Sequence, residues 1–365
     1  MAINTKNTVK TDKTLRCVRA AALLLAVLLT VCACSVKPPR EVPTAEPQTA
    51  SPTETASVDV SEPAAAPSTA APIAQTGYTN PVPQSYTEES AHPGSIVTLS
   101  YDSKDYLRGD APIIKTAQIY LPYSYDENSE ERYDVLYLMH GWTGNEGEFF
   151  TVLGGKIKRL LDNMIDGGSI APLIVVGAAF YNENSDTGFY ESVDELCVFH
   201  CDFRENLMPA VESRFRTYAT SVSEEDLIAS RDHRAFGGFS MGSATTWNEF
   251  CYDSEFIRWY LPMSGGCICF GGWDDYDTQR TCDYFEQLIA EKSLDERGFF
   301  IYSATGTEDW LKYQVDDLMN EMLKRPSVFT PVHLAYYLKQ GGVHNHDAVM
   351  EYMYNALPLF FRGDN

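Results

Sequence analysis

The chain has 365 residues, a formal net charge of −23 at pH 7 and a hydrophobic content of 44%. Its length is enough for one large domain with appendages or for two domains, and its apolar content is enough for a buried core. The acidity argues against nucleic acid or an anionic membrane surface as a partner, because both would repel the protein.

The N-terminus has the pattern of an export signal. Several lysines and arginines precede an apolar run over residues 20–33, which is shorter than the roughly 20 residues of a membrane-spanning helix. A basic region before a short apolar region is typical of a secretory signal peptide. Because Val-Cys-Ala-Cys at its end resembles a bacterial lipobox, we expect residues 1–34 to be a lipoprotein-type signal with lipidation at Cys34. An ordinary cleavage site and Cys32 as the anchor are the alternatives.

Residues 35–85 consist mainly of Pro, Ala, Thr, Ser and Glu and hold few large apolar side chains. Such a segment cannot bury enough surface to offset its ordering entropy, so we expect a disordered, extended tether. A lipid anchor and a tether predict an exported bacterial lipoprotein at the cell surface, attached to the membrane only through Cys34.

From residue 86 onward, apolar runs of strand length alternate with apolar positions at helical spacing. The expected strands are 95–100, 114–121, 135–139, 173–178, 234–239, 257–263, 299–304 and 332–338. The expected helices include residues 157–165, 203–215, a run that opens at 242–244, and 349–360. This alternation predicts a mostly parallel central sheet with helices on both faces, and no boundary divides 86–365, so we expect one domain there.

The central motif is Gly-Phe-Ser-Met-Gly at residues 238–242. Gly-x-Ser-x-Gly between a strand and a helix is the nucleophile elbow of the α/β-hydrolase fold. In that turn the Ser240 hydroxyl stands above the sheet edge, and the backbone N–H of Met241 points to where an oxyanion would form. Because the motif also fits a plain strand–helix turn, a catalytic role requires an acid and a base farther along the chain.

Three histidines follow Ser240, at positions 333, 344 and 346. His333 lies inside an expected strand and is interpreted as a packing residue. His344 and His346 lie in a glycine-rich loop between the last strand and the last helix, where this fold places its base. We favour His344, because the glycines before it let the imidazole reach over the strand edge; His346 is the alternative base, or a pocket-wall or surface residue.

The catalytic acid is expected after the strand at 299–304, where Glu308 and Asp309 are the candidates. We favour Asp309, which would fix the tautomer of His344; Glu308 is the alternative, and a helix-capping acidic loop is the structural interpretation. A second oxyanion donor is expected from His-Gly-Trp at 140–142, with the backbone N–H of Trp142 as donor and His140 as a structural residue.

Four motifs taken together resemble the feruloyl esterase and acetylxylan esterase family, which is related to esterase D and to the bacterial mycolyltransferases. They are Leu-Met-His-Gly at 138–141, Gly-Phe-Ser-Met-Gly at 238–242, Gly-Thr-Glu-Asp at 306–309 and Gly-Gly-Val-His at 341–344. The resemblance covers residues 90–362. It implies a serine esterase with Ser240, His344 and Asp309 as its triad and the amides of Met241 and Trp142 as its oxyanion hole.

The resemblance also implies the substrate class: hydroxycinnamoyl or acetyl esters of plant cell-wall xylan, with no cofactor. Ser243 stands where many members have a third glycine, and Asn345 and His346 depart from the usual loop after the histidine. The second departure touches the pocket wall and leaves the acyl specificity open. The expected substrate-binding residues are Trp142, Tyr181, Trp273, Trp310 and His346.

Two other residue groups are candidates for metal sites. Asp274, Asp275 and Asp277 fit a solvated loop better than a calcium site. The later cysteines could form disulfides in an exported protein or stay free, and none is in the Cys-x-x-Cys spacing of a zinc site, so no metal site is expected. These cysteines are Cys197, Cys201, Cys251, Cys267, Cys269 and Cys282.

Three interpretations of function follow. The favoured one is a feruloyl esterase, and the first alternative is an acetylxylan esterase, another small-ester hydrolase or an acyltransferase. A surface protein that keeps the fold only to bind carbohydrate is the non-enzymatic alternative. The complete set of Ser240, His344 and Asp309 favours an enzyme, because a disused site usually loses one member. The sequence does not indicate an oligomeric state.

Overall fold

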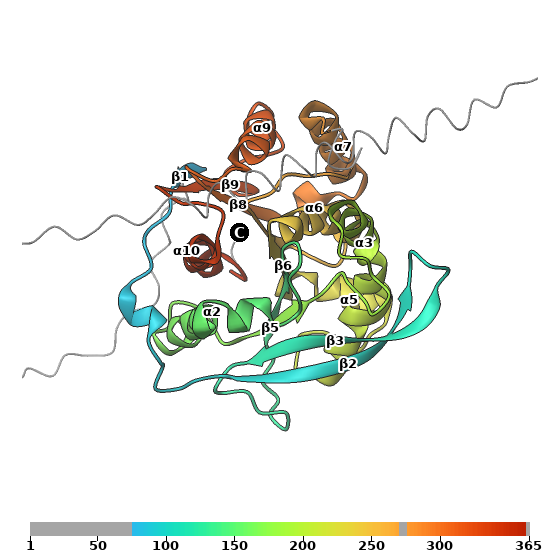
Figure 1. Ribbon diagram of the computed structural model, residues 1–365, viewed down its shortest axis with the longest axis vertical. Coiled ribbons are helices and arrows are strands. Elements are labelled where there is room, and N and C mark those ends of the chain that lie inside the picture. The colour runs from blue at the N-terminus through green and yellow to red at the C-terminus, as the bar shows by residue number, and fades with distance from the viewer. Residues whose placement is uncertain (1–74, 270–275, 363–365) are drawn as a thin grey trace, which may run out of the picture. The chain divides into compact units, whose positions relative to one another are not determined.

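A nine-stranded sheet lies at the centre of the computed structural model, which describes residues 75–269 and 276–362 (Figure 1). The strands follow the order β1-β9-β8-β7-β6-β4-β5-β3-β2. Strand β3 pairs antiparallel with both β2 and β5, whereas the other neighbours pair in parallel. The expectation of a mostly parallel α/β-hydrolase sheet is confirmed.

The sheet is formed by strands of very different length. The strands are β1 (Thr76–Tyr78), β2 (Ser95–Asp105), β3 (Ala111–Leu121), β4 (Asp134–Met139), β5 (Leu173–Ala178), β6 (Arg234–Phe239), β7 (Trp259–Met263), β8 (Phe300–Gly306) and β9 (Leu334–Lys339). The helices are α2 (Glu148–Asp166), α3 (Phe189–Asp202), α4 (Met208–Arg214), α5 (Glu224–Ala229), α6 (Met241–Asp253), α7 (Thr278–Glu291), α8 (Leu294–Arg297), α9 (Lys312–Leu323) and α10 (His346–Ala356). The shorter helical turns are η1 (Gln84–Thr87), η2 (Phe203–Leu207), η3 (Arg231–His233) and η4 (Leu357–Leu359).

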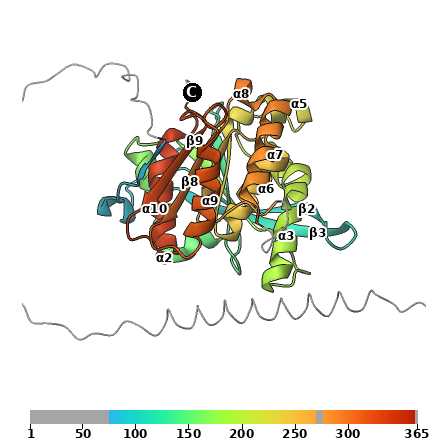
Figure 2. The ribbon, with the colours of Figure 1, turned by 90° about the horizontal axis from the view of Figure 1, so that it is seen from above.

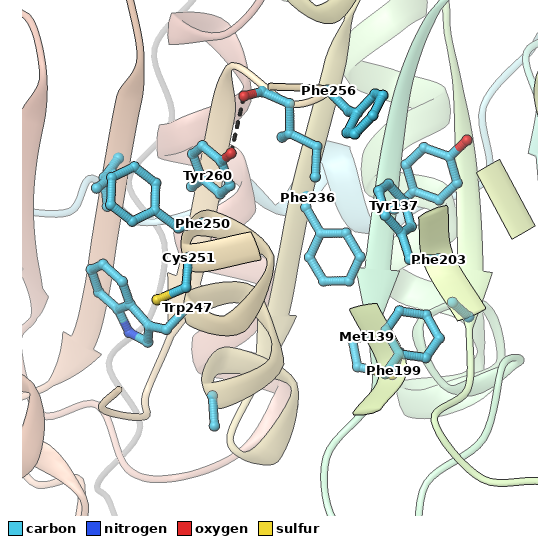
Figure 3. Packing of buried hydrophobic residues seen from close by; sticks show 14 of the residues in the cluster. Tyr137, Met139, Phe199, Phe203, Phe236, Trp247, Phe250, Cys251, Phe256 and Tyr260 are labelled. Carbon is cyan, nitrogen blue, oxygen red and sulfur yellow. Dashed lines mark hydrogen bonds between the residues drawn. The ribbon is translucent and has the colours of Figure 1, made fainter. Parts of the chain in front are cut away.

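Helices cover both faces of the sheet. Helices α2 and α10 lie on one face, and α3, α6, α7 and α9 lie on the other (Figure 2). Apolar side chains of these helices, and of α4 on the second face, pack against the sheet. Figure 3 shows part of the second layer, where aromatic residues of α6 meet those of β6 and β7. Every residue of β5, β6 and β8 is buried, as expected for parallel strands covered on both faces.

The folded part begins before residue 86, where composition had placed the end of the tether. Strand β1 pairs with β9 along Thr76 to Tyr78, and Thr79 continues the contact by donating its backbone N–H to Leu338 O at 2.9 Å. The boundary prediction was wrong for this stretch because the strand is held by backbone hydrogen bonds, which composition does not report.

Two expected helices have different limits in the structure. The apolar positions at 157–165 belong to the second part of α2, which begins at Glu148 and is interrupted by non-helical backbone from Val152 to Gly155. The positions expected for one helix at 203–215 fall on η2 and α4, which continue α3. Helices α3, α7 and α9 had not been expected as separate elements.

Several sequence expectations fall outside the described residues: the signal with Cys34, most of the tether, and Trp273, Asp274 and Asp275. Asp277 is described, and it caps α7 by accepting the backbone N–H of Arg280 at 3.0 Å. All six later cysteines are free, so no disulfide joins described residues. Among those residues, no helix combines the length and the apolar character needed to cross a membrane.

Candidate active site

Ser240 lies in a strained turn between β6 and α6. Its backbone has φ 59° and ψ −115°, a conformation that costs a non-glycine residue energy and is found mainly at functional sites. The turn fits because Gly242 has no side chain: a Cβ there would lie 2.0 Å from Met139 O of β4. Ser240 remains partly exposed, whereas all of β6 before it is buried. The hydroxyl is therefore presented at the carboxyl end of a rigid strand.

The loops after β8 and β9 are joined to each other. Glu308 donates its backbone N–H to Gly342 O at 2.9 Å, and Gly341 donates its own to Thr307 Oγ1 at 2.8 Å. This close contact requires glycine at 306, where a Cβ would lie 2.0 Å from Gly342 O. The glycines of these loops therefore also fix one loop against the other.

These loops bring Asp309 and His344 together. His344 Nδ1 lies 3.0 Å from both carboxylate oxygens of Asp309, whose side chain is 0% exposed. Asp309 Oδ1 also accepts the backbone N–H of Leu311 at 2.8 Å. With Nδ1–H donated to the carboxylate, Nε2 carries the lone pair, which is the tautomer that a general base needs. Glu308 is exposed and is not part of this contact.

The imidazole of His344 is held between two aromatic rings. Its centroid lies 4.5 Å from that of Phe239, the residue before Ser240, and 5.0 Å from that of Trp310. The packing on Phe239 places His344 beside the turn that holds Ser240. Among the described residues, no hydrogen bond joins the Ser240 hydroxyl to His344. Such contacts are often long in ligand-free enzymes and tighten when substrate binds.

The loop after β4 lies directly against Ser240. A Cβ on Gly141 would meet Ser240 Cβ at 3.4 Å, so the peptide before Trp142 borders Ser240. Within the described part of the chain, the backbone N–H groups of Met241 and Trp142 have no hydrogen-bond partner. Both amides are therefore available to a substrate oxygen.

His140 contacts this loop from the protein interior. It is fully buried, its Nδ1 lies 2.7 Å from Gly141 O, and its ring packs on Phe180 at 4.4 Å and Tyr181 at 5.4 Å. Burial lowers the pKa of His140, which keeps the imidazole neutral. His140 thus positions the loop through packing and one hydrogen bond.

Glu148, which the sequence had not suggested as a site residue, connects two of the site loops. Its Oε1 accepts the backbone N–H of Gly141 at 3.3 Å and lies 3.0 Å from His346 Nε2. Burial opposes its ionisation, but the hydrogen bond and charge of His346 outweigh burial and lower the pKa of Glu148. No local signal could have revealed the pair, because its members are 198 residues apart.

The expected substrate-binding residues occupy different surroundings. Trp310 is 47% exposed next to His344. Trp142 is half-buried, and its indole N–H donates to Thr187 O at 2.9 Å. The Tyr181 hydroxyl lies 2.7 Å from Ser192 Oγ and accepts the backbone N–H of Thr143 at 3.3 Å. His346 contacts Glu148, as described above, and Trp273 lies outside the described residues.

Comparison with known proteins places this geometry in a family. The esterase family model ("Putative esterase") matches residues 115–246. The chain is 32% identical over 287 residues to endo-1,4-beta-xylanase Y of Acetivibrio thermocellus, which covers 77% of this chain and 24% of that protein. It is 33% identical over 158 residues to an endo-1,4-beta-xylanase/feruloyl esterase of Xylanibacter ruminicola, covering 42% of this chain and 20% of that protein. The chain thus spans about a quarter or less of these relatives.

One solved structure is matched over nearly its whole length. The feruloyl esterase module from Clostridium thermocellum, studied as a serine-to-alanine mutant complexed with sinapinate, has a TM-score of 0.68 and 31% identity, covering 79% of this chain and 95% of the module. The ferulic acid esterase of Anaeromyces mucronatus, at 18% identity and TM-score 0.55, shares the fold. The protein described here therefore belongs to the feruloyl esterase family and is a serine carboxylic-ester hydrolase.

Proposed function

We propose that this esterase releases hydroxycinnamic acids, such as ferulic acid, from their esters on plant cell-wall xylan. The observation that carries the proposal is the Asp309–His344 pair, held at 3.0 Å beside the partly exposed Ser240. The near end-to-end similarity to a feruloyl esterase module, solved with a hydroxycinnamate, supports the choice of acyl group.

The proposed first step acylates Ser240. His344 Nε2 takes the proton of the Ser240 hydroxyl as Oγ attacks the ester carbonyl, and the backbone N–H groups of Met241 and Trp142 stabilise the resulting oxyanion. When the tetrahedral intermediate collapses, His344 returns this proton to the leaving sugar oxygen. The products of this half-reaction are the free sugar hydroxyl and a feruloyl ester on Ser240.

The proposed second step removes the acyl group with water. His344 takes a proton from the water as the water oxygen attacks the acyl carbonyl. His344 then donates that proton to Ser240 Oγ as the carboxylic acid leaves. Asp309 remains ionised through both steps and stabilises the imidazolium that forms twice in each cycle. No cofactor enters this scheme.

Trp310 supplies a surface that suits an aromatic acyl group or a sugar ring. It is 47% exposed, its ring centroid lies 5.0 Å from that of His344, and Tyr313, three residues later, is 57% exposed. Exposed aromatic rings beside a catalytic base can stack on a planar ligand. We assign Trp310 a direct role in substrate binding, and we assign Tyr181 and His346 the support of the loops around the site.

The experiment compares ester classes on one enzyme preparation. The rate constants kcat/KM are measured for methyl ferulate, feruloylated xylan oligosaccharides and acetylated xylan. The proposal expects feruloyl esters to be the preferred substrates, with the oligosaccharide esters hydrolysed fastest. Faster release of acetate would instead assign the protein as an acetylxylan esterase, and absence of hydrolysis of every ester would leave carbohydrate binding as its role.

We also propose that the enzyme is exported and anchored at the bacterial cell surface through a lipid on Cys34. The basic and apolar N-terminal region with its lipobox-like end supports this location. Metabolic labelling with a palmitate analogue should mark the wild type and leave Cys34→Ser unlabelled. Labelling that persists in Cys34→Ser and is lost in Cys32→Ser would move the anchor to Cys32.

A further inference from the structure

The sulfur atoms of three cysteines lie close together near the C-terminal end of α6, the helix that begins after Ser240. Cys251 belongs to the last turn of α6, and Cys267 and Cys269 belong to the segment after β7. Figure 3 shows Cys251 next to Trp247 in the apolar layer on this side of the sheet. The sulfur of Cys269 lies 3.3 Å from that of Cys251 and 3.2 Å from that of Cys267, and all three sulfurs lie within 4.8 Å of one another.

We propose that Cys251, Cys267 and Cys269 bind one thiophilic divalent cation of the zinc class. A tetrahedral ion with Zn–S distances of about 2.3 Å separates its sulfur ligands by about 3.8 Å, close to the spacing found here. Cys269 is almost equidistant from its two neighbours, whereas a disulfide would join one pair and leave the third thiol aside. The sequence had suggested no metal site because none of these cysteines has Cys-x-x-Cys spacing.

Asn248 supplies an oxygen ligand or an outer partner for the same ion. Its Oδ1 lies 2.8 Å from Cys269 Sγ. Its Nδ2 donates to Leu196 O at 3.2 Å, which turns the carbonyl oxygen of the amide toward the sulfurs. A hydrogen bond to Asn248 also acts on the Cys197 thiol. A buried amide thus contacts the Cys269 thiol, as in sites where an outer partner orients a ligand.

A divalent ion would displace the thiol protons into solvent as the metal–sulfur bonds form.

An ion at this position would brace the helix that follows the nucleophile. The segment after β7 already contacts α6, because Gly265 O accepts from Ser243 Oγ at 2.8 Å and from Trp247 Nε1 at 3.3 Å. Bonds from one ion to the sulfurs of Cys251, Cys267 and Cys269 would attach this segment to the C-terminal end of α6 as well. The role assigned is structural, and it does not depend on the ester that the enzyme hydrolyses.

The test uses purified full-length protein under reducing conditions, with Co²⁺ as a spectroscopic probe and Zn²⁺ as the competing ion. We expect one equivalent of Co²⁺ to give intense thiolate-to-cobalt charge-transfer absorption that Zn²⁺ abolishes. Zn²⁺ should also raise the melting temperature of the wild type, because it binds the folded state. Cys269→Ser should lose the absorption, and Asn248→Ala should bind about 10–100-fold more weakly, as is typical when an outer partner is removed.

The matched control is Cys201→Ser, which removes a partly exposed cysteine outside the cluster and should keep the Co²⁺ spectrum. Absence of charge-transfer absorption in folded, reduced wild type would overturn the proposal, whether or not the variants fold. A mass lower by two hydrogens under non-reducing conditions, mapped to a link between Cys251 and Cys267 or Cys269, would also overturn it and assign a disulfide.

Discussion

The polar side chains at the two ends of strand β6 differ in their hydrogen bonding. At the amino end, the Arg234 side chain is 1% exposed and donates to Glu212, to Ser230 Oγ and to the backbone carbonyl groups of Leu227 and Phe256. At the carboxyl end, Ser240 has strained backbone, and its hydroxyl makes no hydrogen bond to the described residues. One end uses its polar contacts to stabilise the fold, and the other keeps them available for a substrate.

Ser240, His344 and Asp309 are gathered without all being hydrogen-bonded to one another, because the surrounding loops hold them in place. The loops after β4, β6, β8 and β9 meet at one edge of the sheet, and backbone hydrogen bonds fix the loop after β8 against the loop after β9. The groups proposed to react can then stay available to the substrate, as preorganised active sites require. Changes at the two ends of β6 should therefore separate activity from stability.

The largest effect on activity is expected for Ser240→Ala. Removal of the nucleophile should lower kcat by about 10⁶-fold, leaving the weak catalysis that binding and the oxyanion hole provide. Steady-state hydrolysis of methyl ferulate measures this loss, and the melting temperature should not fall. Ser243→Ala, which removes a nearby buried hydroxyl bonded to Gly265 O, is the control and should remain an active esterase. Comparable loss in both variants would contradict the assignment of Ser240.

Asp309→Asn should follow, with kcat about 10⁴-fold lower, because an amide in this position favours the wrong tautomer of the base. The control is Glu308→Gln, which changes the adjacent, exposed carboxylate and should keep nearly full activity. The reverse result, with Glu308→Gln inactive and Asp309→Asn active, would transfer the role of the acid to Glu308.

At the opposite end of β6, Arg234→Met should lower the free energy of unfolding by about 3–5 kcal/mol, because it leaves the buried Glu212 carboxylate without its cation. The activity of each folded molecule should change little. Denaturant titration measures the stability, and active-site titration normalises the rate. Adding Glu212→Leu should recover most of the loss, since removing both charges avoids an unpaired buried charge. A large drop in kcat in fully folded protein would show that the amino end of β6 also controls activity.

A smaller effect is expected for Glu148→Gln, which weakens the link between Gly141 and His346. Misplacement of the oxyanion loop should lower kcat by about 10–100-fold. The control is Glu146→Gln, which alters a carboxylate two residues away that binds Thr116. Equal losses in both variants would show that the effect is not specific to Glu148.

The Glu148 pair also predicts a dependence of stability on pH. The pKa of Glu148 is lower in the folded protein than the ordinary value, so its stabilising contribution is present above the pKa of the unfolded chain, about 4.3. This contribution is lost as the pH falls through the folded-state pKa. The stability difference between wild type and Glu148→Gln should therefore be full near neutral pH and shrink in acid. A difference that grows in acid would contradict the assigned charge state.

Much of the fold, and the positions of the main candidate site residues, could be predicted from the sequence. Buried parallel strands are nearly continuous apolar runs, and the glycine-containing turns after them mark where Ser240, Asp309 and His344 lie. These signals are local. Whether His344 or His346 meets Asp309 is decided by the contact of two loops, and here the structure places His344 at the acid and His346 at Glu148.

The features that escaped prediction depend on contacts between distant segments. Strand β1 has an unremarkable composition and joins the sheet through its backbone. Glu148 and His346 are far apart in the chain, so neither suggests the other. The cysteine cluster unites a helix with a separate segment, and its spacing matches no simple metal motif. Each of these features becomes visible only after the sheet has set the geometry.

The most direct test of Ser240 as the nucleophile is to trap the acyl-enzyme. The enzyme is mixed with an activated aryl ester of ferulic acid, quenched with acid before the steady state, digested and examined by mass spectrometry. We expect a feruloyl group on the peptide that contains Ser240, and this group should be absent in Ser240→Ala. Rapid turnover with no adduct on that peptide, or an adduct on another residue that persists in Ser240→Ala, would contradict this role of Ser240.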